Sequence, residues 1–219
     1  MTTESEDPPK AEPKIALGVD AGLTHAVTLS SGETVEYPRY FLQEEEKLKI
    51  AQRGLSRKMK GSANRARARL KVARIHQRIQ NLRDEFLHQS SRKLVDSADL
   101  IVFENLNING MLKNKYLAKH IQDHAWGKLI QFTISKAAKA GKIIELVDAR
   151  YTSQKCSNCC IMVPKTLAER THACPNCGLE LDRDHNAAKN IVTLGLRGRA
   201  YQDPTPTLNC GSRQAGSMT

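Results

Sequence analysis

Short strand-like segments separated by turn residues occupy positions 15–39 of the chain. Residues 15–20 form an apolar run that ends in a carboxylate, Asp20. Residues 25–30 and 33–39 form two further runs, and Ser31-Gly32 between them is a hairpin signal. The pattern predicts a meander of three strands, with Asp20 close to the end of the first. A single Asp at such a place is more often an ordinary turn residue than a catalytic one.

The hydrophobic period changes to that of a helix over residues 42–93. The segment contains no proline, and its glycines are confined to positions 54 and 61. Apolar residues from Leu70 to Leu87 recur at roughly helical spacing. The sequence therefore predicts one long helix, or a helical hairpin broken near Gly61.

Three further elements follow before the cysteine-rich region. Residues 100–106 form a compact β-type run that places Glu104 among apolar neighbours, where a carboxylate is costly unless it is paired or binds a cation. Residues 116–140 predict one amphipathic helix that ends at Gly141, and residues 142–147 predict another strand. The helix is expected to face a core with these residues: Ile121, Trp126, Leu129, Ile130 and Ile134.

Positive charge is concentrated in the predicted hairpin. The chain has a net charge of +11, and from Lys47 to Lys93 there are fifteen Lys or Arg against two acids. A solvated helix face usually mixes charges of both signs, so this segment favours contact with nucleic-acid phosphates. The candidate contacts are Arg53, Arg57, Lys58, Lys60, Arg65, Arg67, Arg69, Lys71, Arg74 and Arg78.

Two CxxC pairs lie in residues 151–180, formed by Cys156 and Cys159 and by Cys174 and Cys177. This spacing is typical of a four-cysteine zinc ribbon, in which one ion is fully coordinated and therefore structural. Two disulfides or a redox CxxC are the alternative interpretation. Cys160 and Cys210 fall outside the pairs and are expected to be bystanders.

The termini and the absence of long apolar runs indicate a cytoplasmic protein with no membrane partner. No apolar run approaches the roughly 18 residues that span a bilayer, and the polar first fourteen residues do not form a secretory signal. We expect residues 1–14 to be a disordered leader and residues 196–219 to be a flexible tail.

Three acids stand at positions from which they could meet. Asp20 ends the first strand, Glu104 lies in the fourth, and Asp182 or Asp184 lies near the start of a helix expected over 184–194. Carboxylate oxygens suit Mg²⁺ or Mn²⁺, and two such ions support in-line phosphodiester hydrolysis. Local spacing does not establish that acids so far apart in sequence converge.

Five motifs in this order closely resemble the C-terminal half of the TnpB (OrfB) family of transposon-encoded, RNA-guided endonucleases, relatives of type V CRISPR effectors. They are GVDAGL (18–23), FENLN (103–107), TSQKCSNC (152–159), CPNCG (174–178) and LDRDHNAAKNI (181–191). The resemblance covers about residues 15–195 and implies an RNase H-like (RuvC) α/β fold, a mixed sheet with helices and an inserted zinc ribbon. It implies that Asp20, Glu104 and Asp184 are the catalytic acids and hold two Mg²⁺ or Mn²⁺ ions, with Asp182 supporting Asp184 or capping its helix.

The resemblance also implies partners and a division of the chain. It predicts a RuvC-like core over 15–150 with the basic insertion at 42–93, a ribbon over 151–180 and a last core helix over 181–195. DNA and a guide RNA are the expected partners, in a prokaryotic cytoplasm, with association to the nucleoid when the protein is bound to DNA. A full-length relative or a transposase is a further candidate partner.

Two departures from the family pattern leave a second hypothesis open. Family members carry a long N-terminal region that holds the guide and reads the motif beside the target, whereas about fourteen residues precede Ile15 here. Cys160 stands where the family tends to have Gly. The second hypothesis is a truncated, catalytically inactive or accessory nucleic-acid-binding protein, and a strand-joining DDE-type transposase is a third, less well-matched interpretation.

Overall fold

A mixed five-stranded sheet forms the centre of the structure, a computed structural model that describes residues 12–116, 118–148, 150–166 and 168–200. Its strands are β1 (Ala16–Asp20), β2 (Val27–Leu29), β3 (Thr34–Val35), β4 (Leu100–Glu104) and β5 (Ile143–Val147). The strand order is β3-β2-β1-β4-β5, with β1, β4 and β5 parallel and the β1–β2–β3 meander antiparallel. The mixed α/β class expected from the sequence is confirmed.

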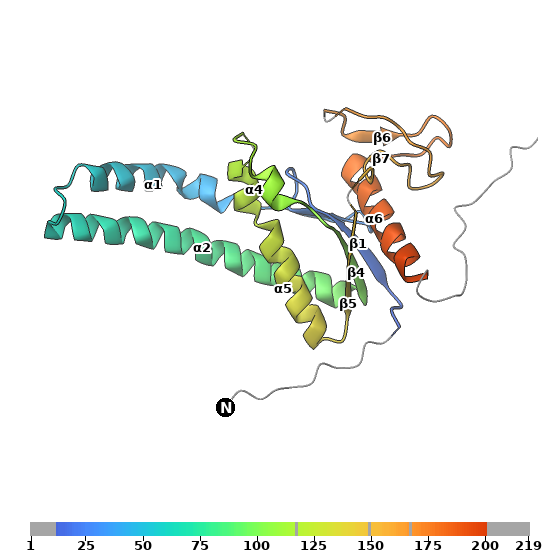
Figure 1. Ribbon diagram of the computed structural model, residues 1–219, viewed down its shortest axis with the longest axis horizontal. Coiled ribbons are helices and arrows are strands. Elements are labelled where there is room, and N and C mark those ends of the chain that lie inside the picture. The colour runs from blue at the N-terminus through green and yellow to red at the C-terminus, as the bar shows by residue number, and fades with distance from the viewer. Residues whose placement is uncertain (1–11, 117, 149, 167, 201–219) are drawn as a thin grey trace, which may run out of the picture.

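The strict alternation of side chains along β1 and β4 divides the core into two layers. On one face, Leu17 and Val19 of β1 and Ile101 and Phe103 of β4 pack against α2 (Ala63–Ser97) and α5 (Trp126–Lys139). On the other face, Leu100 and Val102 pack against α6 (Arg183–Ala200). Because successive residues of a strand point to opposite faces, Asp20 and Glu104 belong to the α6 face. Figure 1 shows α6 and α5 on opposite sides of the sheet.

Two glycines allow α6 to lie unusually close to this sheet. A Cβ on Gly18 of β1 would lie 2.1 Å from the carbonyl oxygen of Ala188, and a Cβ on Gly195 of α6 would lie 2.5 Å from Cγ2 of Val102. Both distances are far below van der Waals contact. At Gly18 the strand backbone lies against the backbone of α6, and at Gly195 the helix backbone lies against the Val102 side chain, so a side chain at either glycine would push the helix and the sheet apart.

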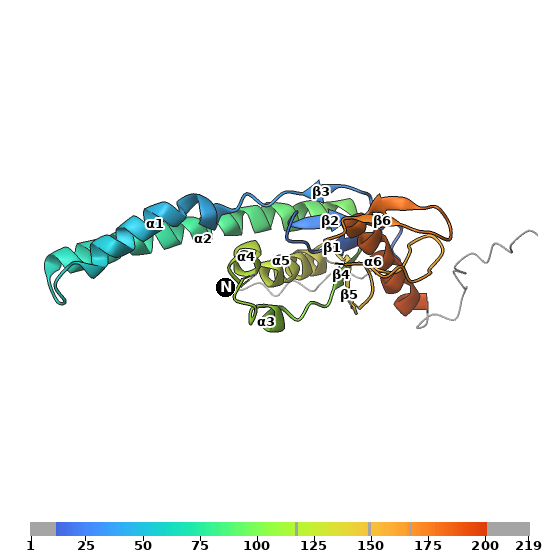
Figure 2. The same ribbon diagram turned by 90° about the horizontal axis from the view of Figure 1, so that it is seen from above.

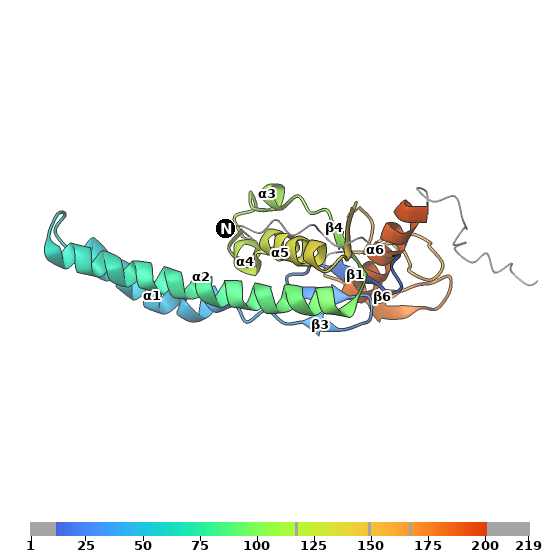
Figure 3. The ribbon, with the colours of Figure 1, turned by 90° about the horizontal axis from the view of Figure 1, so that it is seen from below.

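The basic segment forms the predicted helical hairpin. Helix α1 (Tyr40–Ser56) and the first half of α2 run antiparallel and project from the sheet on the side away from α6, as Figures 2 and 3 show from two directions. Gly61 turns the chain with a φ of +83°, and the Ser62 hydroxyl caps α2 by accepting from the Arg65 amide. Buried residues of α1 recur at Glu44, Leu48 and Ala51, which is the spacing of one helix face.

The prediction of one helix over 116–140 is wrong. The structure has α4 (Ala118–His124) and α5, separated by Ala125 in the left-handed region with a φ of 50°. The turn lets Asp123, His124 and Trp126 all be buried, which one face of a continuous helix does not permit. Ile134, expected toward the core, is 42% exposed, and Thr133 and Ala137 are buried in its place. A short helix α3 (Ile108–Met111), which was not predicted, precedes α4.

The cysteine-rich segment and the end of α6 complete the fold. Two short antiparallel strands, β6 (Thr171–Ala173) and β7 (Glu180–Asp182), form a separate small sheet beside the N-terminus of α6. Helix α6 continues to Ala200, so its expected end near residue 195 was placed too early. Residues 1–11 and 201–219, which include Cys210 and most of the expected leader and tail, lie outside the described residues. Among the helices that are described, none combines the length and apolar character needed to cross a membrane.

Candidate active site and four-cysteine site

The sheet brings Asp20 and Glu104 to the same edge. They end two neighbouring parallel strands whose register pairs Val19 with Phe103, so the carboxylates follow at corresponding positions. Both side chains point to the α6 face, where Asp184 begins the helix. The carboxylate of Asp184 lies beside the turn after β1, 3.7 Å from the position that a Cβ on Gly22 would take. The fold therefore gathers three acids that are separated by up to 164 residues.

The negative charges of Glu104 and Asp184 both act on Asp20. Burial raises the pKa of Asp20 well above its usual range, and the negative charges of Glu104 and Asp184 raise it further. Burial also raises the pKa of Glu104, against a lowering by the hydrogen bond from Thr152. All three residues are at most 9% exposed. Such a cluster of buried carboxylates is unfavourable unless it is protonated or neutralised by cations, so its chemistry fits divalent metal ions.

Asp184 is fixed by its own helix terminus and by two arginines. The Oδ1 atom of Asp182 accepts hydrogen bonds from the backbone amides of Asp184 at 2.8 Å and His185 at 3.2 Å, so Asp182 caps α6. Arg183 Nε lies 3.1 Å from Asp184 Oδ1, and Arg170 lies 3.5 Å from Oδ2. The capping contact leaves Asp184 as the residue of this pair that is buried beside Asp20.

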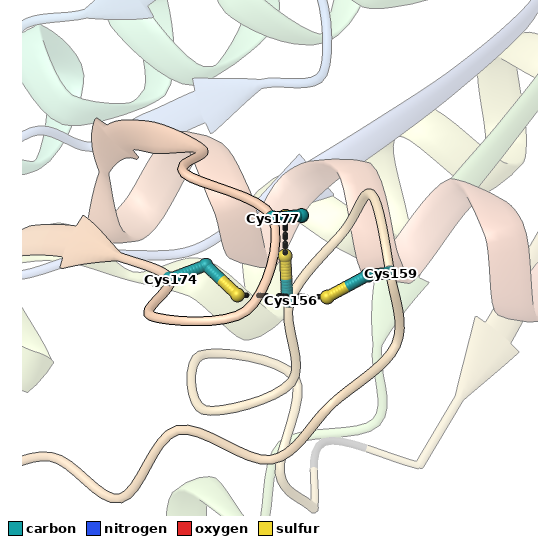
Figure 4. Close-up of side chains that lie close together, drawn as sticks. All are labelled: Cys156, Cys159, Cys174 and Cys177. Atoms are coloured by element: carbon teal, nitrogen blue, oxygen red, sulfur yellow. Dashed lines mark hydrogen bonds between the residues drawn. The ribbon is translucent and has the colours of Figure 1, made fainter. Parts of the chain in front are cut away.

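The four paired cysteines form a second, separate cluster. Their sulfur atoms all lie within 4.8 Å of one another, and two Sγ–Sγ distances are 3.6 Å (Cys156–Cys177) and 3.5 Å (Cys159–Cys174). Four ligands at the Zn–S distance of 2.3 Å, arranged as a tetrahedron, lie about 3.8 Å apart. Figure 4 shows the four side chains converging from two loops. The donor set and its dimensions thus fit one tetrahedral zinc ion.

The two loops that carry the cysteines have the same backbone geometry. The amide of Cys156 donates to the Ile161 carbonyl and that of Cys174 donates to Leu179, both at 2.9 Å. The residue after each second cysteine is left-handed, with a φ of 64° at Cys160 and 69° at Gly178. A left-handed backbone favours glycine, which explains why a residue other than Gly at position 160 is unusual.

Backbone donors prepare the second cysteine of each pair for metal binding. Donation from the Ile161 amide lowers the pKa of Cys159 to about 6, and donation from Leu179 lowers the pKa of Cys177. Burial raises the pKa of Cys156 to about 12, so this thiol needs a nearby cation in order to ionise at neutral pH.

The candidate nucleic-acid contacts lie along the hairpin. Nine of the ten predicted Lys and Arg side chains are exposed. Arg65 differs, because its guanidinium donates to the carbonyls of Leu55 and Lys58 and so ties the hairpin turn to the end of α1. Arg78 lies 3.7 Å from Glu44. The other eight side chains of the set are exposed.

Polar residues between the ribbon and the core were not singled out from the sequence. Thr152 contacts Glu104, and the side-chain amides of Asn186 and Asn190 bind the loop that leads into the first cysteine pair. The spacing of the two asparagines, four residues apart on one helix face, is the signal that indicates a shared partner. Thr152 stands within one of the five motifs, but its target lies 48 residues away and has no local signature.

Comparisons with protein families match almost the whole described chain. The model described as "OrfB_IS605: Probable transposase" matches residues 1–115. A second model, described as "Cas12f1-like, TNB domain", matches residues 126–191, which include the four-cysteine site and Asp184.

Relatives give the same picture. A protein from Streptomyces pristinaespiralis, named "Putative RNA-guided DNA endonuclease", is 43% identical over 86% of this chain and 47% of its own length. The protein InsQ of Escherichia coli, with the same description, is 30% identical over 89% of this chain and 53% of its own length. The CRISPR-associated endodeoxyribonuclease Cas12f1 of Sulfoacidibacillus thermotolerans is 30% identical over 80% of this chain and 44% of its own. The chain thus spans about half the length of these curated relatives.

The fold matches a solved structure as well. A chain of a Cas12f1–sgRNA–target DNA complex superposes with a TM-score of 0.61 at 16% identity, over 84% of this chain and 51% of that chain. At this identity the match establishes the fold.

Proposed function

The chain belongs to the OrfB_IS605 family of probable transposases, and from this premise we propose that it is a metal-dependent DNA endonuclease directed by a guide RNA. The observation that carries the proposal is the cluster of Asp20, Glu104 and Asp184 at the edge of the sheet. Relatives over most of the chain are named as RNA-guided DNA endonucleases, which supports the choice of DNA as substrate and RNA as guide.

The three acids would hold two Mg²⁺ or Mn²⁺ ions. Such ions, when bound, supply the activation of water and the charge neutralisation needed for in-line displacement at a phosphodiester. Asp20 and Glu104 stand on neighbouring strands of the sheet, and Asp184 stands on a helix packed directly against it, so the backbones that carry the three acids are held in place before substrate arrives. The expected products are a 3′ hydroxyl and a 5′ phosphate.

We propose that the chain has a RuvC-like nuclease core over 15–150, a zinc ribbon over 151–180 and a last core helix from 181. The basic hairpin would bind the nucleic-acid backbone, because its positive charges project into solvent on the side of the core away from α6. A full-length relative or a transposase remains a candidate partner, and a prokaryotic cytoplasm is the expected place of action.

The proposal is tested by DNA cleavage with Mg²⁺, with and without a guide RNA. We expect Asp20→Asn and Glu104→Gln to lower the cleavage rate by on the order of a hundredfold or more, since the loss of a metal ligand costs several kcal/mol in the transition state. Asp96→Asn is the matched control, because Asp96 is exposed and pairs with Arg92. Equal cleavage by wild type and both site variants would assign the activity to a contaminant and refute the proposal.

A further inference from the structure

Thr152 connects the four-cysteine segment to the acid cluster. It is 5% exposed, and its hydroxyl donates a 2.5 Å hydrogen bond to Oε1 of Glu104. It stands four residues before Cys156, in the segment that leads from β5 into the ribbon. The hydroxyl thus approaches the glutamate from the ribbon side, while β4 holds the glutamate backbone.

The helix that carries Asp184 holds Thr152 from the other side. The side-chain amide of Asn190 donates to the carbonyls of Thr152 at 2.7 Å and Lys155 at 2.6 Å. Asn186 donates to Lys155 at 2.8 Å and accepts from the Ser157 amide at 3.0 Å. Both asparagines are at most 7% exposed, so these bonds are shielded from water. Loop 152–157 is therefore fastened to α6 along its length.

We propose that Thr152 is a positioning residue that orients the Glu104 carboxylate for a divalent cation, with Asn190 holding Thr152 in place. The inference rests on the proposed function in one respect, namely that Glu104 is a metal ligand. A glutamate side chain has several rotatable bonds, and a hydrogen bond to one oxygen fixes the plane of the carboxylate while leaving lone pairs for a cation. The same loop bonds to β4 through Glu104 and to α6 through Asn190, so it fixes two metal ligands relative to each other.

The test measures metal affinity directly on the full, zinc-loaded chain without nucleic acid. Mn²⁺ is titrated and followed by electron paramagnetic resonance in wild type, Thr152→Val and Thr152→Ser. Valine has nearly the same shape as threonine but lacks the donor, so we expect Thr152→Val to weaken Mn²⁺ binding about tenfold or more, the usual cost of losing an outer-shell partner. Serine keeps the hydroxyl, and we expect Thr152→Ser to bind within about threefold of wild type.

A matched control separates positioning from simple packing. Thr133 is fully buried in α5 and donates to its own helix at the Leu129 carbonyl, so Thr133→Val makes the same chemical change away from the acids. We expect this variant to bind Mn²⁺ as wild type does. Zinc content is measured for every variant, and each is expected to retain one ion per chain.

The outcomes separate this inference from the proposed function. Weaker Mn²⁺ binding by Thr152→Val, restored by serine, supports the inference even if no DNA is cut under any condition. Equal Mn²⁺ affinity of Thr152→Val and wild type overturns it, whatever the nuclease activity. A wild-type chain with no Mn²⁺ site that depends on Asp20 also overturns it, because Glu104 would then have no cation to receive.

Discussion

The close approach of α6 to β1 leads to a sharp prediction about Gly18. A Cβ at this position would lie 2.1 Å from the Ala188 carbonyl oxygen and 2.8 Å from the Val192 amide nitrogen. Both contacts are to backbone atoms, which have no rotamer through which to escape. Ordinary contact begins near 3.4 Å, so Gly18→Ala requires α6 to move from β1 by roughly 1.3 Å.

The displacement has two measurable costs. Overpacking of this kind destabilises a protein by about 1–3 kcal/mol, which for a chain of this length corresponds to a fall in Tm of roughly 2–12 °C. Because Asp184 begins α6, the shift also moves it relative to Asp20. A misplacement of about 1 Å in a catalytic group costs on the order of a hundredfold in rate, so DNA cleavage should fall by that factor.

Gly198 supplies the control on the same helix. A Cβ there meets nothing within 4 Å, so Gly198→Ala adds a methyl group without a clash. Alanine is a better helix former than glycine by about 1 kcal/mol, and this variant should melt slightly higher than wild type and cut DNA normally. Thermal melts and cleavage rates of the two alanine variants are compared side by side. A Gly18→Ala variant with wild-type Tm and rate would refute the close packing of α6, as would equal damage from the two substitutions.

Further outcomes follow from the metal sites and the hairpin. Removal of zinc by a chelator, or Cys159→Ser, should lower Tm and release one zinc per chain. The reason is that thiolate coordination supplies the folding free energy that so small a segment cannot obtain from a hydrophobic core. An unchanged thermal melt and zinc content would disprove the zinc ribbon. Without Mg²⁺, Asp20→Asn should be more stable than wild type at pH 7 and should lose this advantage near pH 4. The reason is that the pKa of Asp20 is raised in the folded state, so wild type loses stability as the pH rises from the ordinary carboxyl range through that pKa. Equal stability of the two proteins at pH 7 would contradict this. Mg²⁺ at a hundredfold excess over its Kd should stabilise wild type by about 2.7 kcal/mol and leave Asp20→Asn little changed. Arg74→Ala should reduce the salt dependence of DNA binding by about one phosphate contact, whereas Arg92→Ala should not, because Arg92 is paired with Asp96. Arg65→Ala should instead lower the stability of the hairpin turn. A change in salt slope with normal stability would reassign Arg65 to nucleic-acid binding.

The features that repeat with a short period could be predicted from the sequence. The strand around Asp20, the strand around Glu104 and the hairpin broken at Gly61 all follow from local patterns, and the structure places them as expected. The CxxC spacing likewise predicts four sulfurs within reach of one ion, which the structure shows. The strands and the turn depend on residues within about one strand or one turn of each other, and each CxxC pair is equally local, although the two pairs are 15 residues apart.

The remaining features depend on contacts between distant segments. The break at Ala125 lies two residues before Gly127, but a single glycine inside a helical pattern does not by itself predict a break. The ion pair of Asp123 with Arg83, 40 residues earlier in the chain, has no signal in the local sequence. Thr152 belongs to no local pattern that identifies its partner, and the spacing of Asn186 and Asn190 indicates a shared partner without showing which segment it is. The meeting of the three acids was implied by the family resemblance rather than by spacing, because it depends on which strands neighbour each other and on the side of the sheet that α6 covers.

The packing of α6 on β1 also determines when, during synthesis of the chain, the three acids can come together. Asp184 follows Asp20 by 164 residues, so at about 5–20 residues per second the ribosome needs roughly 8–33 s to make the second residue after the first. Throughout that interval β1 lacks the helix that packs against Gly18, and Glu104, which follows Asp20 by 84 residues, is made about halfway through it. Under the proposed function, a nascent chain that already carries the whole basic hairpin would bind nucleic acid before it could cut it. The order of the segments would then delay cleavage until the ribbon and the last helix have emerged.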